Sequence, residues 1–327
     1  MDITLLVAIG CHRQTTLAEL KEKLGEDLFR SVRINVHDAF DPKCSIGIGR
    51  LPSGAELLLD KTAAEADLLA AEGFIEPHFF AGFSGGRKSV LPGICGKSTV
   101  YENHCGEFIA HERARCGVLE GNPIHRDMEA AAEMAGLRFI VNAVLNGEKK
   151  TAAMFAGDFR KAHAAGVEYL KRSCTVKAVP GDTVLVTNGG SPLDQNLYQC
   201  VKGLAAAEAT AAPGAVLILC AEMADGIGGE GFYRDLKECE SPAQLYRRFT
   251  ETPRQDTVPD QWQTQILCRI LMKHRVIFVT RPEMEKPIRD MKMEYAPDVD
   301  TALAMAGGGR LTVIPDGVGV CVLPQEP

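Results

Sequence analysis

The chain has 327 residues, of which 46% are hydrophobic and 24% are charged, and its formal net charge is −7. This length predicts roughly two domains of ordinary size. The charge balance is acidic and no stretch concentrates lysine and arginine, so nucleic acid is not expected as a partner. No apolar run approaches the roughly 18 residues that a membrane span needs, and we therefore expect a soluble globular protein with no membrane partner.

The first residues lack the features of an export signal. Asp2 stands where a basic region would be, and the first apolar run ends in Cys11-His12-Arg13 instead of small residues. A cytoplasmic protein is therefore expected. The 11 cysteines are scattered without a Cys-x-x-Cys pair, so neither a disulfide framework nor a thiolate zinc site is predicted.

Short β-branched runs alternate with amphipathic stretches along the chain. The expected strands, in chain order, are Ile3–Ile9, Val32–Val36, Phe139–Val144, Thr183–Thr187, Ala215–Cys220, Val276–Thr280 and Arg310–Ile314. The expected helices are Thr16–Leu24, Ala63–Ala71, His125–Ala135, Pro192–Ala211, Pro242–Phe249, Gln261–His274 and Thr301–Ala306. This alternation predicts an α/β fold with mainly parallel sheets. A boundary between two α/β domains is expected near Arg172, before Val179-Pro180-Gly181-Asp182 leads into a new strand.

A glycine-rich loop between histidines is the most distinctive segment. Residues 74–104 place His78, Lys88 and His104 around a loop whose glycines would let the backbone approach a ligand closely. A phosphate-binding P-loop is excluded, because the pattern that starts at Gly82 requires glycine at the position of Arg87.

A literal Gly-x-Gly-x-x-Gly occurs at Gly226, Gly228 and Gly231. It lies several residues beyond the strand expected to end near Cys220, whereas a dinucleotide site needs it in the turn that follows the strand directly. The match is therefore a weak sign of a dinucleotide site.

Two further segments follow predicted strands. His12 comes after the first strand, at the strand end where ligands bind in α/β sheets, although it can equally cap the next helix. Gln199 and Lys202 are three residues apart on one helix face, which either meets a ligand or is simply solvated. The remaining histidines are expected on surfaces, turns or helix faces: His37, His111, His125, His163 and His274.

The segment from His78 to His104 closely resembles the nickel-pincer lactate racemase family, whose motif reads His-x-x-Ala-Gly-Phe-Ser-Gly-Gly-x-Lys, then Pro-Gly, then His. The resemblance implies that Lys88 carries a covalently attached pyridinium mononucleotide with sulfur donors, and that His104 is the protein ligand of the nickel ion held in that nickel-pincer nucleotide. Both residue types suit these roles, because a neutral imidazole binds nickel and a deprotonated lysine amine is a nucleophile. The loop residues implied to contact the cofactor are Gly82, Ser84, Gly85 and Gly86.

The resemblance extends to other segments. Gly10-Cys11-His12-Arg13 matches a family segment, which implies that His12 and His78 are the two acid/base residues on opposite faces of the substrate. The Gly-Gly-x-Pro-Leu-Asp-x-Asn-x-Tyr-Gln-x-x-Lys pattern from Gly189 also matches. It implies that Tyr198 and Gln199 contact the cofactor. Substrate contacts are expected from Lys202, Arg13 and Trp262.

These assignments imply a racemase or epimerase of a lactate-like 2-hydroxy acid. Removing the α-hydrogen as a proton beside a carboxylate is difficult, and in the family's scheme it moves as hydride to the nickel pincer, giving a transient 2-keto acid. The active site is expected in a cleft between the domains, with 1–172 carrying the cofactor, nickel and histidines and 173–327 contributing Gln199 and Lys202. The implied partners are the small hydroxy acid and the enzymes that synthesise the cofactor.

Family members carry an Asp-x-x-Arg upstream of the segment that matches Ile3–His12, and Met1 begins after it. The first domain is therefore expected to lack its upstream part, including an arginine that helps hold the substrate carboxylate. Two alternatives stay open: a nicotinamide-dependent 2-hydroxy-acid dehydrogenase built on Gly226–Gly231, and a catalytically silent truncated member of the family.

Overall fold

The protein is described here as a computed structural model that covers residues 2–323. The chain divides into two compact units. Unit 1 comprises Met1–Glu76, Ser84–His104 and Leu119–Leu170, and unit 2 comprises Pro77–Phe83, Cys105–Val118 and Lys171–Pro327. Within this division, His78 and its short hairpin belong to unit 2.

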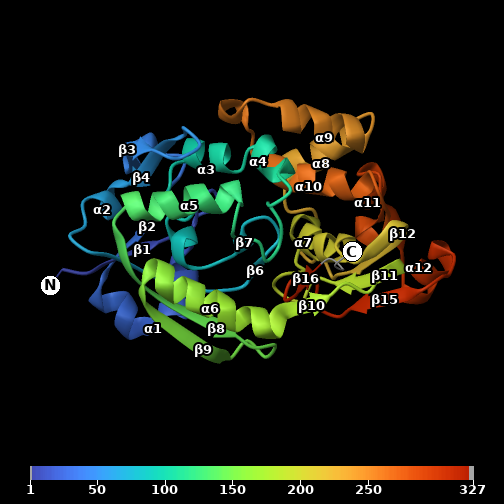
Figure 1. The fold of residues 1–327 in the computed structure, drawn as a ribbon, viewed down its shortest axis with the longest axis horizontal. Helices are drawn as coiled ribbons and strands as arrows, with labels where there is room; N and C mark the ends of the chain where they lie inside the picture. The colour runs from blue at the N-terminus through green and yellow to red at the C-terminus, as the bar shows by residue number, and fades with distance from the viewer. Residues whose placement is uncertain (1, 324–327) are drawn as a thin grey trace. The chain divides into compact units, whose positions relative to one another are not determined.

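Unit 1 contains three small sheets (Figure 1). Its strands are β1 (Thr4–Val7), β2 (Arg33–Val36), β3 (Ser45–Arg50), β4 (Glu56–Asp60), β5 (Leu69–Phe74), β8 (Leu137–Leu145) and β9 (Thr151–Asp158). Its helices are α1 (Leu17–Ser31), α2 (Lys61–Ala64), α3 (Lys97–Asn103), α5 (Pro123–Met134) and most of α6 (Phe159–Cys174), with short 3-10 turns η1 (Pro42–Cys44) and η2 (Gly86–Ser89). β1 pairs with β2 in parallel and β3 with β4 in antiparallel. In the third sheet β8 pairs in parallel with β5 and in antiparallel with β9.

Helix α6 runs along the third sheet of unit 1, beside β8 and β9 in Figure 1. Gly166 makes this close packing feasible, because a Cβ atom there would lie 3.1 Å from the ring of Phe155 and 2.3 Å from Ile75 Cδ1. Packing of helices against the sheet edges and faces buries the apolar side chains that stabilise the unit.

Unit 2 is built around a five-stranded parallel sheet with the order β14-β13-β12-β11-β15. Its strands are β6 (Pro77–His78), β7 (Gly82–Phe83), β10 (Thr175–Lys177), β11 (Gly181–Thr187), β12 (Ala211–Cys220), β13 (Arg275–Val279), β14 (Glu294–Ala296), β15 (Leu311–Ile314) and β16 (Cys321–Leu323). Its helices are α4 (Gly106–Ala110), α7 (Leu197–Glu208), α8 (Glu230–Glu238), α9 (Pro242–Glu251), α10 (Gln261–Leu271), α11 (Glu285–Asp290) and α12 (Val299–Ala306), with 3-10 turns η3 (Arg254–Asp256) and η4 (Pro282–Met284).

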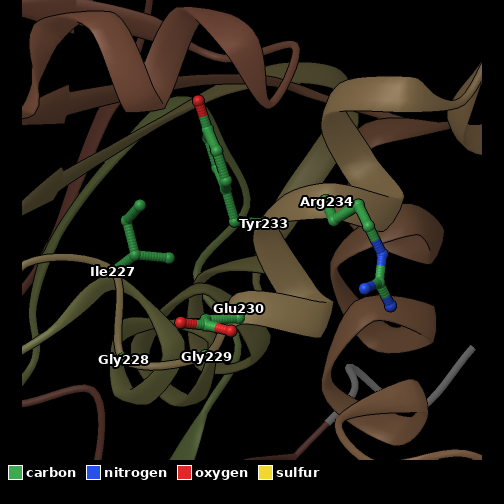
Figure 2. Close-up of a pocket in the computed structure, with 6 residues that line it drawn as sticks. All are labelled: Ile227, Gly228, Gly229, Glu230, Tyr233 and Arg234. Carbon is green, nitrogen blue, oxygen red and sulfur yellow. The ribbon is translucent and has the colours of Figure 1, made fainter.

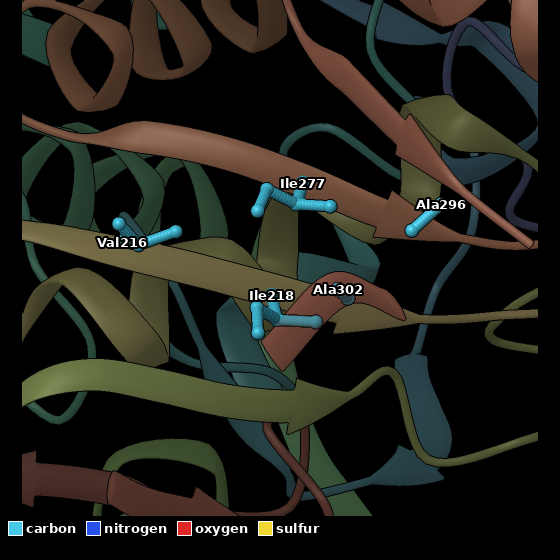
Figure 3. Close-up of a cluster of buried hydrophobic side chains, with 5 residues drawn as sticks. All are labelled: Val216, Ile218, Ile277, Ala296 and Ala302. Carbon is cyan, nitrogen blue, oxygen red and sulfur yellow. The ribbon is translucent and has the colours of Figure 1, made fainter. Parts of the chain in front are cut away.

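The core of this sheet is apolar, as expected for parallel strands that helices cover. Figure 3 shows one cluster, in which Val216 and Ile218 of β12 and Ile277 of β13 pack with two alanines. Ala296 ends β14 and Ala302 belongs to α12, and both are fully buried. The small side chains let helix α12 lie close to the strands.

The order of the five strands creates a switch point. From β11 the chain proceeds outward through β12, β13 and β14, and then returns through α12 to β15 on the other side of β11. In open α/β sheets, ligands bind outside the carboxyl ends of the strands at such a point. Helix α7, which follows β11, begins there.

The α/β fold with mainly parallel sheets is confirmed, and so are most of the expected strands. The expected helix Ala63–Ala71 is wrong, because α2 ends at Ala64 and residues 69–74 form β5 in parallel pairing with β8. Tertiary pairing thus overrides the helix propensity of this alanine-rich stretch. The expected helix Pro192–Ala211 is too long at both ends, since α7 begins after Asn196 and β12 already starts at Ala211. Within residues 2–323, no helix is long and apolar enough to cross a membrane.

Candidate active site

The lysine expected to carry the cofactor lies in η2 of unit 1. Two glycines precede it with positive φ, Gly85 at +75° and Gly86 at +53°. A Cβ atom on Gly85 would lie 2.7 Å from the Phe74 carbonyl oxygen, and one on Gly86 would lie 2.9 Å from the His163 ring. Both the backbone conformation and the lack of space therefore require glycine before Lys88.

Polar contacts inside unit 1 hold this loop. The Gly86 N–H donates to Asn142 Oδ1 over 2.8 Å, and Ser84 Oγ donates to the Phe74 carbonyl over 3.1 Å. Ser84 Oγ also accepts from the Glu76 N–H at 2.8 Å. Of the four residues expected to contact the cofactor, Ser84, Gly85 and Gly86 thus lie in unit 1 with Lys88, whereas Gly82 lies in the β6–β7 hairpin of unit 2.

Sequence reasoning missed a cluster around Arg87. The Arg87 side chain is 2% exposed, and its Nε donates to His125 Nδ1 over 3.0 Å. Its Nη1 donates to the carbonyls of Ser84 (3.3 Å) and Gly85 (3.2 Å) and lies 3.1 Å from His163 Nε2. Burial lowers the pKa of Arg87 to about 9. The guanidinium therefore ties the loop of Lys88 to helices α5 and α6.

The loop that carries His12 is joined to the loop that carries Lys88. The Gly10 N–H donates to the Gly93 carbonyl over 2.9 Å, and the Gly93 N–H donates to the Lys88 carbonyl over 3.2 Å. Gly10 has a φ of +55° and packs against Pro92. His12 itself is exposed and lies in the loop between β1 and α1.

His104, like Lys88 and His12, lies in unit 1. It follows α3 directly and is 5% exposed. Burial, the charge of Lys88 and the proximity of His12 lower the pKa of His104 to about 3. Its imidazole is therefore neutral at physiological pH, and the three residues lie close enough for their charges to interact.

Arg13 contacts a residue of the following helix. Its guanidinium forms an ion pair with Glu19, with nitrogen-oxygen distances of 2.5 and 3.0 Å, and its side chain is 73% exposed. Glu19 also closes a capping box with Thr16 at the start of α1. The structure thus gives Arg13 a local role at a helix start.

His78 lies in unit 2, on the two-residue strand β6 that pairs with β7. Its Nδ1 accepts a hydrogen bond from the Ala81 N–H at 3.2 Å, which places the ring proton of neutral His78 on Nε2. The ring packs edge-on against Phe80, with ring centres 4.5 Å apart. The hairpin therefore fixes both the orientation and the tautomer of this histidine.

Helix α7 positions the remaining predicted residues at the switch point of unit 2. Asn196 caps the helix by accepting from the Gln199 N–H at 3.0 Å. Half-buried Lys202 lies one turn beyond Gln199. Among residues 2–323, the buried Gln199 Oε1 has no hydrogen-bond partner. A buried acceptor of this kind favours a ligand that donates a hydrogen bond.

Tyr198 and Trp262 lie on joined elements. The Tyr198 side chain hydrogen-bonds Asp260, which precedes α10, and its carbonyl accepts from Gln263 Nε2. Half-buried Trp262 lies in the first turn of α10, between these two partners of Tyr198. The first turns of α7 and α10 thus hold both aromatic residues in one region of unit 2.

The glycine-rich stretch after β12 has a structural role. The carbonyls of Gly226 and Ile227 accept from the N–H groups of Leu197 and Tyr198, both at 3.0 Å. Gly228 has a φ of +83°, and a Cβ atom there would lie 2.4 Å from Asn196 Cγ. These contacts satisfy the start of α7 and explain the glycines without a dinucleotide.

Figure 2 shows a hollow beside this stretch, where the loop enters α8. Its volume is about 410 Å³. It is lined by Ile227, Gly228, Gly229, Glu230, Tyr233 and Arg234.

The other histidines were expected on surfaces, turns or helix faces, and three of them are buried. His37 is fully buried, with Nδ1 2.7 Å from Asp60 Oδ2 and Nε2 3.0 Å from the Cys95 carbonyl. His163 and His274 are also buried, the latter with Nδ1 3.2 Å from the Ala215 carbonyl. Each is accommodated by hydrogen-bonding partners that lie far away in the sequence.

Comparison with known proteins gives a consistent result. Residues 1–117 match the lactate racemase N-terminal domain, and residues 176–322 match the lactate racemase C-terminal domain. The chain is 50% identical over 326 residues to the lactate racemase of Thermoanaerobacterium thermosaccharolyticum, covering 98% of this chain and 76% of that protein. It is 49% identical over 325 residues to the lactate racemase of Lactiplantibacillus plantarum, covering 98% and 77%.

Solved structures agree. The lactate racemase apoprotein from Thermoanaerobacterium thermosaccharolyticum superposes with a TM-score of 0.97 at 50% identity, over 98% of this chain and 78% of that one. A protein from Thermotoga maritima shares the fold, with a TM-score of 0.72 at 19% identity over 99% of this chain and 86% of that one. The matched domains and the long alignments show that this chain belongs to the lactate racemase family and is an isomerase.

Proposed function

We propose that this protein racemises lactate or a closely similar 2-hydroxy acid. The observation that carries the proposal is the grouping of Lys88, His104 and His12 in unit 1. Backbone hydrogen bonds join the loops of Lys88 and His12. Both residues lie close enough to His104 to lower its pKa. The relatives that are 49–50% identical over 98% of the chain are lactate racemases. Together these features favour racemisation over the dehydrogenase and the catalytically silent alternatives.

The residues fit a nickel ion held by an attached nucleotide. Among residues 2–323, no group of three or more His, Cys, Asp or Glu side chains could hold a metal ion. A nickel ion at His104 therefore needs most of its donors from a bound group, as a sulfur-bearing nucleotide on Lys88 would provide. His104 is buried and neutral, which is the form of imidazole that binds a metal. When bound, this nickel-pincer nucleotide would accept the α-hydrogen of the substrate as hydride and return it.

Lys88 would hold the nucleotide through its side-chain nitrogen. The neutral amine is the nucleophile that attaches to an activated carbonyl. The glycines before Lys88 and the buried Arg87 fix the backbone from which this side chain extends. A fixed attachment point is what positions a reacting group reproducibly.

His12 and His78 would move the hydroxyl proton of the substrate. One histidine takes this proton as the 2-keto acid forms, and a histidine on the other face donates a proton when the hydroxy acid forms again. The Ala81 N–H at Nδ1 leaves the Nε2–H of neutral His78 as a hydrogen-bond donor. To take the hydroxyl proton at Nε2, the ring must first change tautomer, and it then returns a proton as an imidazolium.

Unit 2 would supply the polar contacts from α7 and α10. The carbonyl oxygen of Gln199 is buried and suited to accept a hydrogen bond from the cofactor. Lys202, one turn further along α7, would bind the substrate carboxylate, since an ammonium is the natural partner of this group. Tyr198 would contact the cofactor and Trp262 the substrate, from the joined first turns of α7 and α10.

The test is a racemisation assay. The protein is produced together with the enzymes that synthesise the cofactor and is incubated with pure L-lactate or D-lactate, and the enantiomers are separated chromatographically. We expect both reactions to reach an equal mixture, and Lys88→Ala to abolish conversion while exposed Lys97→Ala preserves it. Turnover that depends on added nicotinamide dinucleotide, or no conversion of either enantiomer, would contradict the proposal.

A further inference from the structure

Three cysteine thiols from distant segments meet in unit 2. The sulfur atoms of Cys116 and Cys321 are 3.2 Å apart. The Cys174 side chain is hydrogen-bonded to Cys321 as well. Cys321 therefore lies between two other thiols, a grouping that the scattered positions in the sequence do not reveal.

The fold brings these residues together through specific backbone contacts. Strand β16 pairs in parallel with β10, and this pairing places Cys321 opposite Thr175, directly after Cys174. On the other side, Gly117 has a φ of +76°, and a Cβ atom there would lie only 3.3 Å from Cys321 Sγ. The Cys116 thiol also donates to the Val320 carbonyl at 3.7 Å. The segment of Cys116 thus lies directly against β16.

The three thiols differ in access. Cys321 is 1% exposed and Cys174 is 4% exposed, whereas Cys116 is partly exposed. The hydrogen bond with Cys116 and burial raise the pKa of Cys321 above its usual range, and the nearby Lys171 charge opposes this shift. A dissolved oxidant therefore reaches Cys116 first, whereas Cys321 lies buried next to it as a protonated thiol.

We propose that Cys116 and Cys321 are an oxidisable pair that closes to a disulfide when the protein meets hydrogen peroxide. The Cys116 thiolate attacks one peroxide oxygen, so that an S–O bond forms, the O–O bond breaks and the released hydroxide is protonated to water. Cys321 sulfur then attacks the resulting sulfenic acid, so that the S–S bond forms and the S–O bond breaks. The Cys321 proton leaves with the hydroxide as a second water. In sum, two thiols are oxidised and one peroxide is reduced.

The geometry allows this step with little movement. A disulfide bond is about 2.05 Å long, so the two sulfur atoms must approach by about 1.1 Å from their present separation. Cys116 lies on an irregular segment outside any helix or strand, which can absorb such a shift. Cys321 is held by the pairing of β16 with β10 and stays in place as the resolving thiol.

The pair lies next to the hairpin of His78. The Gly117 N–H donates to the Gly82 carbonyl over 3.1 Å, and Gly82 is the pairing partner of His78. A disulfide at Cys116 would therefore form one residue before Gly117, whose N–H supports the strand partner of His78. The cysteine pair is thus a modification site beside the hairpin, and the proposal for it does not depend on the role of His78.

Mass spectrometry of thiols tests the proposal without any activity measurement. The full chain is exposed to a small excess of hydrogen peroxide, quenched with an alkylating reagent and digested without reduction. We expect the intact protein to lose two hydrogen masses and the digest to contain a peptide that joins Cys116 to Cys321. Dithiothreitol should reverse both changes.

Three variants sharpen this test. In Cys116→Ser, disulfide formation at Cys321 should be at least roughly tenfold slower, because the accessible thiol is gone. In Cys321→Ser, Cys116 should proceed to sulfinic acid, because no thiol resolves the sulfenic acid. Cys44→Ser, which removes a partly exposed cysteine of unit 1, should behave like the parent protein. A disulfide that forms at the parent rate in Cys116→Ser, or Cys116 sulfinic acid without the joined peptide in the parent protein, would overturn the proposal.

Discussion

Arg87 Nε donates a hydrogen bond of 3.0 Å to His125 Nδ1, and this contact fixes the proton of the His125 ring on Nε2. Burial and the Arg87 charge lower the pKa of His125 to about 4, so the imidazole stays a neutral acceptor at physiological pH. A buried guanidinium is thus held by neutral groups, directly before the lysine proposed to carry the cofactor. The planar guanidinium of Arg87 can donate to His125 and to the two loop carbonyls at the same time.

Arg87→Lys should therefore destabilise the protein. A lysine keeps the charge but cannot reach His125 and the two loop carbonyls together, and loss of buried charge-assisted hydrogen bonds costs about 1.5–3 kcal/mol each. We expect unfolding free energy to fall by about 2–4 kcal/mol in urea titrations. Arg126→Lys, on the exposed face of the same helix α5, is the matched control and should change it by less than about 0.5 kcal/mol. Equal effects in the two variants would show that the Arg87 contacts contribute nothing.

Acid should destabilise the protein through His163. Burial and the Arg87 charge lower the pKa of His163 to about 3, from 6.5 in the unfolded chain. Between these pH values the unfolded state binds a proton that the native state does not. Stability therefore falls as the pH drops from 6.5 toward 3, by at most about 1.4 kcal/mol per pH unit for this residue.

His163→Gln should reduce this pH dependence, measured as the slope of unfolding free energy against pH between 6 and 4. The substitution of exposed His111 by Gln is the control and should leave the slope as it is. The slope is the relevant readout, because loss of the contacts of His163 with Arg87 and Ser84 shifts the stability at every pH. Identical slopes in the two variants would refute the assignment.

Gln199→Met should separate stability from activity. Gln199 Oε1 is buried without a hydrogen-bond partner among residues 2–323, and such an acceptor costs about 1–3 kcal/mol. The variant should therefore be as stable as the parent or more stable, while racemisation slows because the proposed cofactor contact is lost. Gln263→Met is the contrast, since Gln263 donates to the Tyr198 carbonyl and its loss should destabilise the protein. A Gln199 variant that loses as much stability as the Gln263 variant would contradict this account.

Gly228→Ala should be far more damaging than Gly226→Ala. Both glycines have positive φ, which costs alanine about 1–2 kcal/mol. At Gly228 the added Cβ would also collide with Asn196, the residue that caps α7, whereas nothing lies within 4 Å at Gly226. We expect a loss of about 3 kcal/mol or more for Gly228→Ala in urea unfolding. Similar losses at both positions would mean that the packing against Asn196 is unimportant.

The fold was predictable where a strand is apolar enough to be recognised alone. Strands β8, β11, β12 and β13 carry such runs, and each was expected within a few residues of its place. Strands β3, β5 and β9 were missed, because their residues are stabilised in strands only by pairing with neighbours that lie elsewhere in the sequence.

The candidate site divides in the same way. Lys88 and His104 belong to one continuous motif, and their roles are predicted from it. The residues that support the loop of Lys88 could not be predicted, because Asn142, His125 and His163 are polar residues on three separate elements and nothing in the sequence connects them to this loop. The substrate contact of Arg13 stays a prediction, and in the structure this exposed side chain pairs with Glu19 at the start of α1.

The fate of the α-hydrogen tests the central claim most directly. The cofactor-loaded protein is incubated in ordinary water with L-lactate that carries deuterium at C2, and both enantiomers are recovered and their deuterium content is measured by mass spectrometry. The account predicts that D-lactate accumulates to half of the total with its deuterium retained, because the α-hydrogen never becomes a proton that exchanges with solvent. D-lactate that carries ordinary hydrogen at C2, or no D-lactate at all, would contradict it.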